Sequence, residues 1–172
     1  MILFGIVFAV LLLIDLITKH ITFLNPGVIE LIPGFLQIAT IRNTGVAFGW
    51  LAGSRFGIIA ITTILMTGLA VFYIWLMRKD KDECRRRRMW WRGGKWMNVA
   101  FAFFLAGGIG NLVDRVFLGY VRDFISFNFF PYIFNFADVW IQVGAIMLCI
   151  YILFMYKDEK EESNDEISSD AS

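Results

Sequence analysis

The stretch Leu105–Trp140 concentrates the side chains of this chain that could carry chemistry. Within a largely apolar and aromatic context its polar side chains include three carboxylates, two amides and a guanidinium that could act together: Asp114, Asp123, Asp138, Asn111, Asn135 and Arg115. Two carboxylates that approach each other do not easily ionise together, so one keeps its proton while the other acts as a base. Such a pair suits hydrolysis of an amide bond. The ionised group activates water, and the protonated group polarises the carbonyl and later protonates the amine.

Spacing groups these residues but does not select the pair. Asn111, Asp114 and Arg115 fall at positions i, i+3 and i+4, so they share one face of a helix. Asn135 and Asp138 fall at i and i+3 and share a face in the same way. The candidate pair is therefore drawn from Asp114, Asp123 and Asp138.

Each polar residue also has a purely structural interpretation. Asp138 would cap the helix that it begins, because a carboxylate is favoured at a helix N-terminus. Arg115 directly follows Asp114, and the two would form a structural ion pair at the membrane boundary. The two amides would join helices by hydrogen bonds. The recurrence of acids, amides and an arginine in three separate segments favours a shared site over these separate roles.

The elements that must position these residues are apolar helices. The chain is 58% hydrophobic with 18 Phe and 6 Trp, far above an ordinary soluble domain. Four segments approach the length of about 20 apolar residues that spans a bilayer: Met1–Ile17, Phe56–Met77, Trp96–Val113 and Ala137–Tyr156. The first lacks a basic start and a small-residue cleavage site, so we expect a retained span and not a signal peptide. The predicted fold is an all-α polytopic membrane protein with four transmembrane helices.

Charge segregation orients this bundle. Nine of the 16 Lys and Arg residues lie between Arg78 and Lys95, which predicts a cytoplasmic loop. With four spans, both termini are cytoplasmic, and the loops Thr18–Arg55 and Arg115–Phe136 share the outer face. Asp15 at the end of the first span would then lie at the depth of Asp114 and Asp138, near the outer surface.

The first outer loop and the C-terminal segment complete the organisation. Phe35–Arg42 is β-prone and bounded by turn residues, which predicts a short sheet on the membrane surface. Val46–Leu51 carries two aromatic residues and suits an interfacial segment. Residues 157–172 are acidic and polar, which predicts a disordered cytoplasmic tail. We therefore expect one domain at residues 1–156, followed by this tail.

Several other chemistries receive little support. His20 is the single histidine, so a zinc site built from His and Cys is hard to assemble. Ser54 and Ser126 lack a GxSxG context, although a Ser–Lys pair with Lys19 stays open. The two cysteines imply no disulfide framework. The basic loop with its tryptophans indicates topology and contacts with lipid phosphates, not a nucleic-acid surface.

The glycines Gly107, Gly108 and Gly110 superficially resemble a phosphate-binding loop. No strand precedes them and no Lys-Ser/Thr follows, so close helix packing is the better interpretation.

Two functions from other classes compete with hydrolysis. A transporter would require ionisable groups near the middle of the bilayer. Phe56–Met77 and Trp96–Val113 contain no charged residue, which argues against transport. A non-catalytic scaffold would tolerate loss of either acid, which hydrolysis would not.

Five sequence blocks, in order, resemble lipoprotein signal peptidase (signal peptidase II), a family of bacterial intramembrane aspartic proteases. The blocks are Asp15-x-x-Thr18-Lys19, Asn43-Thr44-Gly45-Val46-Ala47-Phe48, Gly107-Gly108-Ile109-Gly110-Asn111-Leu112-Val113-Asp114-Arg115, Val121-Arg122-Asp123-Phe124 and Phe134-Asn135-Phe136-Ala137-Asp138. With the four apolar segments and the basic loop, the resemblance covers residues 1 to about 156.

The resemblance implies that Asp123 and Asp138 are the catalytic pair. It also implies residues that line the site and hold the substrate backbone, namely Asn43, Asn111, Arg115 and Asn135, and supporting residues, namely Asp15, Lys19 and Asp114. The implied substrate is a prolipoprotein whose cysteine already carries diacylglycerol, cut just before that cysteine at the bacterial cytoplasmic membrane. No metal or other cofactor is implied. We expect a monomer among membrane phospholipids, without a nucleic-acid partner.

Two positions depart from the family pattern. Ala106 stands where many relatives have a further glycine, and a methyl group there changes little. Arg122 stands where an apolar residue is expected. Its charge would lower the pKa of the adjacent Asp123, which leaves open which aspartate is the base.

Overall fold

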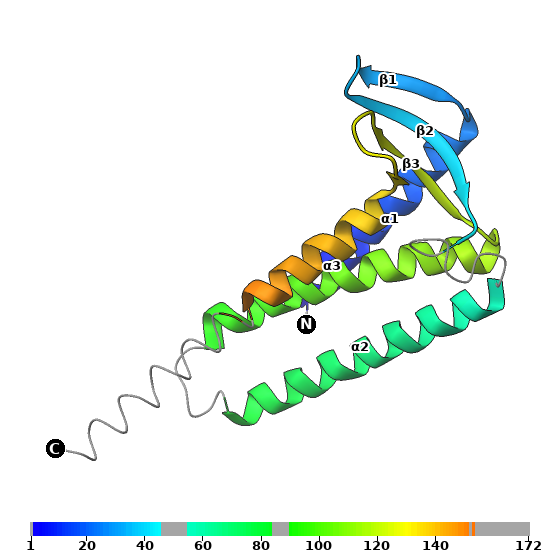
Figure 1. Cartoon of the computed structure of the whole chain (residues 1–172). Coiled ribbons are helices and arrows are strands. Elements are labelled where there is room, and N and C mark those ends of the chain that lie inside the picture. The colour runs from blue at the N-terminus through cyan, green and yellow to red at the C-terminus, as the bar shows by residue number, and fades with distance from the viewer. Residues whose placement is uncertain (1, 46–54, 84–89, 152, 154–172) are drawn as a thin grey trace.

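The computed structural model describes residues 2–45, 55–83, 90–151 and 153. Long helices run side by side and carry a small antiparallel sheet at one end of the bundle (Figure 1). In chain order the elements are α1 (Ile2–Leu24), β1 (Val28–Ile32), β2 (Leu36–Asn43), α2 (Arg55–Glu83), α3 (Trp90–Phe117), β3 (Val121–Phe127) and β4 (Ile133–Phe134), followed by the C-terminal helix Phe136–Tyr151.

The apolar helices agree in place with the predicted spans. In the part of the chain that the structure describes, three helical segments are long and apolar enough to cross a membrane: Ile2–Leu24, Arg55–Trp75 and Lys95–Phe117. The C-terminal helix Phe136–Tyr151 is apolar but shorter. The protein is therefore helical and of membrane-protein type, with a small sheet added.

The predicted end of the first helix is wrong. Asp15 was expected to close the span, but α1 continues to Leu24 and places Asp15 well inside the helix. The helix tolerates the carboxylate because Lys19, one turn later, lies 2.8 Å from it, and both side chains are fully buried. The hydroxyl groups of Thr18 and Thr22 donate hydrogen bonds to backbone carbonyls one turn earlier in the helix, so these residues also fit an apolar helix.

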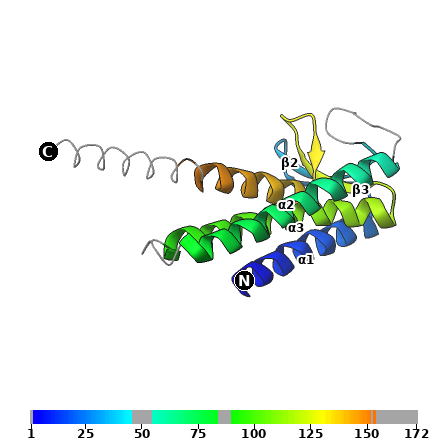
Figure 2. The ribbon, with the colours of Figure 1, turned by 90° about the horizontal axis from the view of Figure 1, so that it is seen from below.

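Helix α3 forms the centre of the bundle and packs against both α1 and α2 (Figures 1 and 2). Its side chains Met97, Phe101 and Leu105 are buried. Tyr73 of α2 packs on Phe101, and Phe4 of α1 stacks on Tyr73. The outer faces of α1 and α2 expose many Ile, Leu and Phe side chains, as expected where lipid and not water is the solvent.

Three glycines let neighbours approach α3 closely, as predicted. A Cβ at Gly107 would lie 2.3 Å from the carbonyl oxygen of Ala137, on the C-terminal helix. At Gly108 it would lie 2.0 Å from Met66 Sδ of α2, and at Gly110 2.4 Å from Asp15 Oδ2 of α1. Each glycine thus serves a different neighbouring helix.

The sheet joins the two loops that were expected on one side of the membrane. Its order is β1-β2-β3-β4, and all neighbours are antiparallel. The prediction of a strand at Phe35–Arg42 is confirmed by β2, whereas β3 was not predicted. In the register of β2 and β3, Ile41 faces Asp123 and Asn43 faces Val121. The expected interfacial segment Val46–Leu51 lies outside the described residues.

Candidate active site

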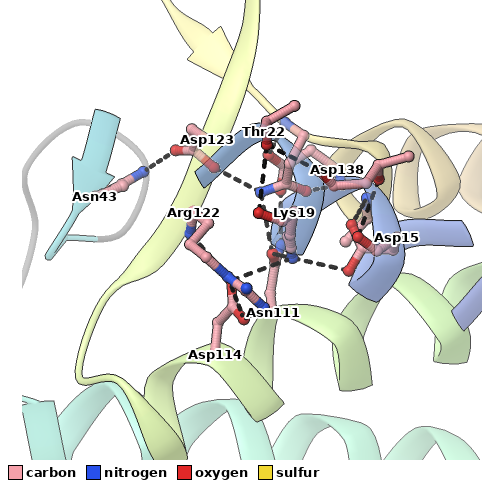
Figure 3. A network of polar contacts seen from close by, with 12 residues as sticks. Asp15, Lys19, Thr22, Asn43, Asn111, Asp114, Arg122, Asp123 and Asp138 are labelled. Atoms are coloured by element: carbon pink, nitrogen blue, oxygen red, sulfur yellow. Dashed lines mark hydrogen bonds and ion pairs between the residues drawn. The ribbon is translucent and has the colours of Figure 1, made fainter. Parts of the chain in front are cut away.

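Polar side chains from five segments converge where the sheet meets the ends of the helices (Figure 3). They come from α1, α3, β2, β3 and the first turn of the C-terminal helix. Gly119, with a φ of 84°, ends the turn after α3 and directs the chain into β3. Asp123 is thereby brought back over the helix that carries Asn111.

Asp123 is almost fully buried, with 2% of its surface exposed. Each of its oxygens accepts a hydrogen bond from an amide: Oδ2 from Asn43 Nδ2 at 2.9 Å, and Oδ1 from Asn135 Nδ2 at 2.5 Å. Burial raises the pKa of Asp123 to about 6, and the charge of Asp138 acts in the same direction. The two amides and the charge of Lys19 lower the pKa but do not offset burial. The group therefore titrates close to neutral pH.

Asp138 and Asn135 cap the C-terminal helix reciprocally. The N–H of Asp138 donates to Asn135 Oδ1 at 3.1 Å, and the N–H of Asn135 donates to Asp138 Oδ2 at 3.2 Å. This is the geometry of a capping box, so the prediction that Asp138 caps this helix is confirmed. Asn135 nevertheless also binds Asp123, so one fully buried residue holds both carboxylates.

Asn111 connects the pair to α1. Its Nδ2 donates to Asp138 Oδ1 at 2.7 Å. Its Oδ1 accepts from Lys19 Nζ at 2.9 Å and from Asn135 Nδ2 at 3.2 Å. The amide is buried and joins three segments, which agrees with its expected role in linking helices.

Asp15 and Lys19 tie α1 to the C-terminal helix. Asp15 Oδ2 pairs with Lys19, while Asp15 Oδ1 accepts the N–H of Ala137 at 2.8 Å. That N–H belongs to the first turn of the helix, where no intrahelical partner exists. Asp15 therefore satisfies an otherwise unpaired donor beside Asp138.

The expected ion pair of Asp114 with Arg115 is wrong. Asp114 is paired with Arg122, whose Nη2 lies 2.7 Å from Asp114 Oδ1. Arg115 Nη2 instead donates to the carbonyl of Gly45 at 3.1 Å. The guanidinium of Arg115 still interacts electrostatically with Asp138, Asp123 and Asp114.

The expected effect of Arg122 on Asp123 is also wrong. Adjacent residues of a strand point to opposite faces, so the guanidinium of Arg122 is directed to Asp114 while Asp123 faces Asn43 and Asn135. The pKa of Asp123 is raised and not lowered.

One contributor was missed by sequence reasoning. Arg55, at the start of α2, donates from Nε to the carbonyl of Arg115 at 3.2 Å and from Nη2 to that of Val116 at 2.7 Å. A cation at a helix C-terminus is favourable, but nothing in the sequence pairs α2 with this end of α3. Together with Asn43, Thr44 and Arg115, Arg55 lines a small depression, and Asn43 in its lining also binds Asp123.

The open alternative of a Ser–Lys pair gains no support. Lys19 is committed to Asp15 and Asn111, and the hydroxyl of Ser126 accepts from Gln37 at 3.2 Å. Ser54 lies outside the described residues. Over the residues that the structure describes, no group of three or more His, Cys, Asp or Glu side chains is arranged to hold a metal ion.

Fold and site together define a multi-pass membrane protein with a buried carboxylate cluster at one end of its helices. The family model described as "Signal peptidase (SPase) II" matches residues 7–154. This chain belongs to the signal peptidase II family, a family of membrane peptidases of bacteria, as its sequence blocks predicted.

Individual relatives agree with this assignment. The lipoprotein signal peptidase of Enterococcus faecalis is 37% identical over 161 residues, covering 91% of this chain and 91% of that protein. The lipoprotein signal peptidase of Fusobacterium nucleatum is 32% identical over 157 residues, covering 89% and 87%. A bacterial membrane enzyme solved by the in meso method at 2.3 Å resolution superposes with a TM-score of 0.74. It is 33% identical, and 92% of each chain is covered.

Proposed function

We propose that this protein is an aspartic endopeptidase that removes the signal peptide from diacylglyceryl-modified prolipoproteins, cutting just before the lipidated cysteine. One observation carries the proposal: Asn135 binds Asp123 through its side-chain amide and Asp138 through its backbone N–H. A single buried residue thus binds both carboxylates, and acid–base catalysis requires that two such groups be held relative to each other.

The charge of the cluster favours one shared proton. Apart from Arg55, which is exposed to solvent, the described residues of the cluster are four carboxylates (Asp15, Asp114, Asp123, Asp138) and three cations (Lys19, Arg115, Arg122). Fully ionised, the cluster carries one uncompensated negative charge in a buried site. One proton on the pair Asp123 and Asp138 makes the cluster neutral, and burial already raises the pKa of Asp123 to about 6.

The reaction follows from this protonation state. The ionised member of the pair takes a proton from water as the water oxygen bonds to the scissile carbonyl carbon. The protonated member donates to the carbonyl oxygen, which becomes the hydroxyl of a tetrahedral intermediate. When that intermediate collapses, the C–N bond breaks, the now protonated member of the pair gives its proton to the leaving amine, and the other member takes the proton of one hydroxyl as the carbonyl re-forms. The two aspartates act as a unit, and the mechanism uses no metal or other cofactor.

The surrounding polar residues have separate roles in this proposal. Asn43, Asn111, Arg115 and Asn135 hold the substrate backbone and orient the pair. Asp15, Lys19 and Asp114 support them from α1 and α3. The protein acts as a monomer surrounded by membrane phospholipids, with the prolipoprotein as its partner.

The orientation of the chain in the membrane is part of the proposal. Residues 1–156 form one four-span domain in the bacterial cytoplasmic membrane, and both termini are cytoplasmic; the predicted tail, residues 157–172, lies outside the described residues. The sheet and the polar site lie at the opposite end of the bundle from the C-terminus of α2 and the N-terminus of α3 (Figure 1), and the sequence from Arg78 to Lys95, which spans these two ends, is the basic segment. The site then faces the outer surface, where a lipidated cysteine presents its scissile bond. In a Cys149→Ser background, Cys84 should react with an impermeant thiol reagent only after the cytoplasmic face is opened.

Cleavage of a lipidated precursor by the purified protein in detergent tests the activity. We expect the wild type to cut the lipidated precursor before the cysteine, unaffected by a chelator, and to leave the unlipidated precursor intact. Asp138→Asn should lower the rate by at least about a hundredfold. Glu30→Gln, which neutralises an exposed carboxylate of β1, is the matched control and should cleave normally. Normal cleavage by Asp138→Asn would contradict the two-aspartate mechanism.

A further inference from the structure

Arg122 has an environment that its position in the sheet does not explain. It is directly opposite Arg42 in the register of β2 and β3, so two like charges share one face of the sheet. Arg42 is exposed and places its guanidinium over the ring of Tyr120, 5.2 Å from the centroid. Arg122 turns inward to the buried Asp114.

The contact with Asp114 is multivalent. Arg122 donates from Nη2 to Oδ1 at 2.7 Å, from Nε to Oδ1 at 3.1 Å, and from its backbone N–H to Oδ2 at 3.0 Å. Asp114 has 1% of its surface exposed. A carboxylate buried to this degree requires compensation, and Arg122 supplies it.

Compensation of Asp114 determines where Lys19 lies. The Lys19 ammonium is 2.8 Å from Asp15 Oδ2 and 2.9 Å from Asn111 Oδ1, but 3.6 Å from Asp114 Oδ2. Without Arg122, Asp114 would keep Lys19 as its ion-pair partner, and Lys19 would need to move by less than an ångström to shorten this 3.6 Å contact to hydrogen-bond distance.

Lys19, together with the NH₂ group of Asn135, fixes the orientation of the Asn111 amide, because both donate to Asn111 Oδ1. An ammonium donates hydrogen bonds and accepts none, so it selects the oxygen of the amide. The NH₂ group of Asn111 must then point the other way, where it donates to Asp138 Oδ1 at 2.7 Å. If the amide turned over, a carbonyl oxygen would face Asp138 and would favour its protonated form.

We propose that Arg122 is a positioning residue for the catalytic pair: by neutralising Asp114 it keeps Lys19 on Asn111, and so keeps the NH₂ group of Asn111 on Asp138. The inference rests on the proposed function. The charged groups gathered around the pair are Asp15 and Lys19 of α1, Asp114 and Arg115 of α3, and Arg122 on β3. Loss of Arg122 removes one positive charge from the cluster and leaves Lys19 as the ion-pair partner of Asp114, which weakens the donor to Asp138. Both changes favour protonation of the pair.

The test compares Arg122→Met with Arg122→Lys, and with Arg42→Met as the matched control on the same face. We expect Arg122→Met to lower kcat about tenfold or more at neutral pH, the effect of one hydrogen bond to a charged group, with little change in KM. The acid limb of its pH–rate profile should move to higher pH. Arg122→Lys should recover much of the wild-type profile, and Arg42→Met should retain all of it.

A double variant keeps the test decisive if Arg122→Met does not fold. Arg122→Met/Asp114→Asn removes both members of the ion pair, so Lys19 has no competing carboxylate, and the acid limb should return toward that of the wild type. The pH dependence of the apparent Tm should shift in the same order and requires no turnover, so it separates this inference from the proposed activity. The role of Arg122 would be overturned if the acid limb of the pH–rate profile of Arg122→Met lay at the same pH as in the wild type. It would also be overturned if the acid limb of the double variant were shifted as far as that of Arg122→Met.

Discussion

Replacing Asp123 with asparagine separates the chemistry of the site from its stability. Asparagine has nearly the shape of aspartate but neither accepts the proton of water nor donates an acidic one. Cleavage should therefore fall by at least about a hundredfold, and the double variant with Asp138→Asn should be little worse, because the two groups act as a unit. The effect on folding is a separate quantity that can be worked out from the burial of the side chain.

The pH dependence of stability follows from the raised pKa of Asp123. Burial moves this pKa from 3.8 to about 6, so between these values the folded protein binds more protons than the unfolded chain. The contribution of Asp123 to the free energy of unfolding is therefore most favourable below the unfolded pKa, and it is lost as the pH rises through about 6. A difference of about 2 pKa units corresponds to about 3 kcal/mol. The asparagine variant does not titrate and lacks this loss.

A second, pH-independent term opposes any gain in the variant. Both oxygens of Asp123 accept from amide NH₂ groups of Asn43 and Asn135, whereas asparagine offers one oxygen and one NH₂ group. One donor then faces another donor, which costs about 1–3 kcal/mol. At neutral pH the two terms nearly cancel, so the variant should insert and fold like the wild type.

The assay is the apparent Tm in detergent for wild type and Asp123→Asn between pH 4 and pH 7.5. Relative to the wild type, the variant should gain about 2–3 kcal/mol across this range. For a chain of this size, such a gain corresponds to about 5–10 °C in Tm. Glu30→Gln, on an exposed strand, should run parallel to the wild type. Parallel curves for Asp123→Asn as well would refute the assignment of a buried, neutral-titrating carboxyl at this position.

Three further outcomes are expected. Asn43→Ala should weaken cleavage and move the acid limb of the pH–rate profile to higher pH, because the Asn43 amide lowers the pKa of Asp123; an unmoved limb would remove Asn43 from the site. Gly110→Ala should lower the apparent Tm, because its Cβ would lie 2.4 Å from Asp15 Oδ2 and overpacking costs about 1–3 kcal/mol; Gly68→Ala, which meets nothing within 4 Å, is its control. Deleting residues 158–172 should leave cleavage within about threefold of the full chain, since so polar a segment buries little; loss of activity at normal expression would reveal a role for the tail.

Local patterns of the sequence were sufficient for the helices and for part of the sheet. A run of about 20 apolar residues has few structural choices, because a helix alone satisfies the backbone hydrogen bonds of a single segment in lipid. The pattern of β2 was readable for a similar reason, since turn residues bound it on both sides. The spacing of Asn135 and Asp138 already contained the capping box, because that motif lies within one helical turn.

The continuation of α1 past Asp15 was decided by the tertiary structure. Considered alone, the carboxylate of Asp15 followed four residues later by Lys19 predicts the end of a membrane span. Here the pair is buried because α3 presents Gly110 and Asn111 to it, and because the N–H of Ala137 requires an acceptor. These partners are remote in sequence, so their contribution appears only once the helices have packed.

The partners of the arginines were likewise beyond local reasoning. Adjacency in sequence suggested Arg115 for Asp114, and Arg122 for Asp123. Both suggestions failed because β3 alternates its side chains between two faces, and its pairing with β2 fixes which face meets α3. The sequence by itself determined which polar residues this protein possesses and where its apolar helices lie. The packing of α1, α3, β3 and the C-terminal helix decided which charge neutralises which, because electrostatic energy depends on distance and burial and not on order along the chain.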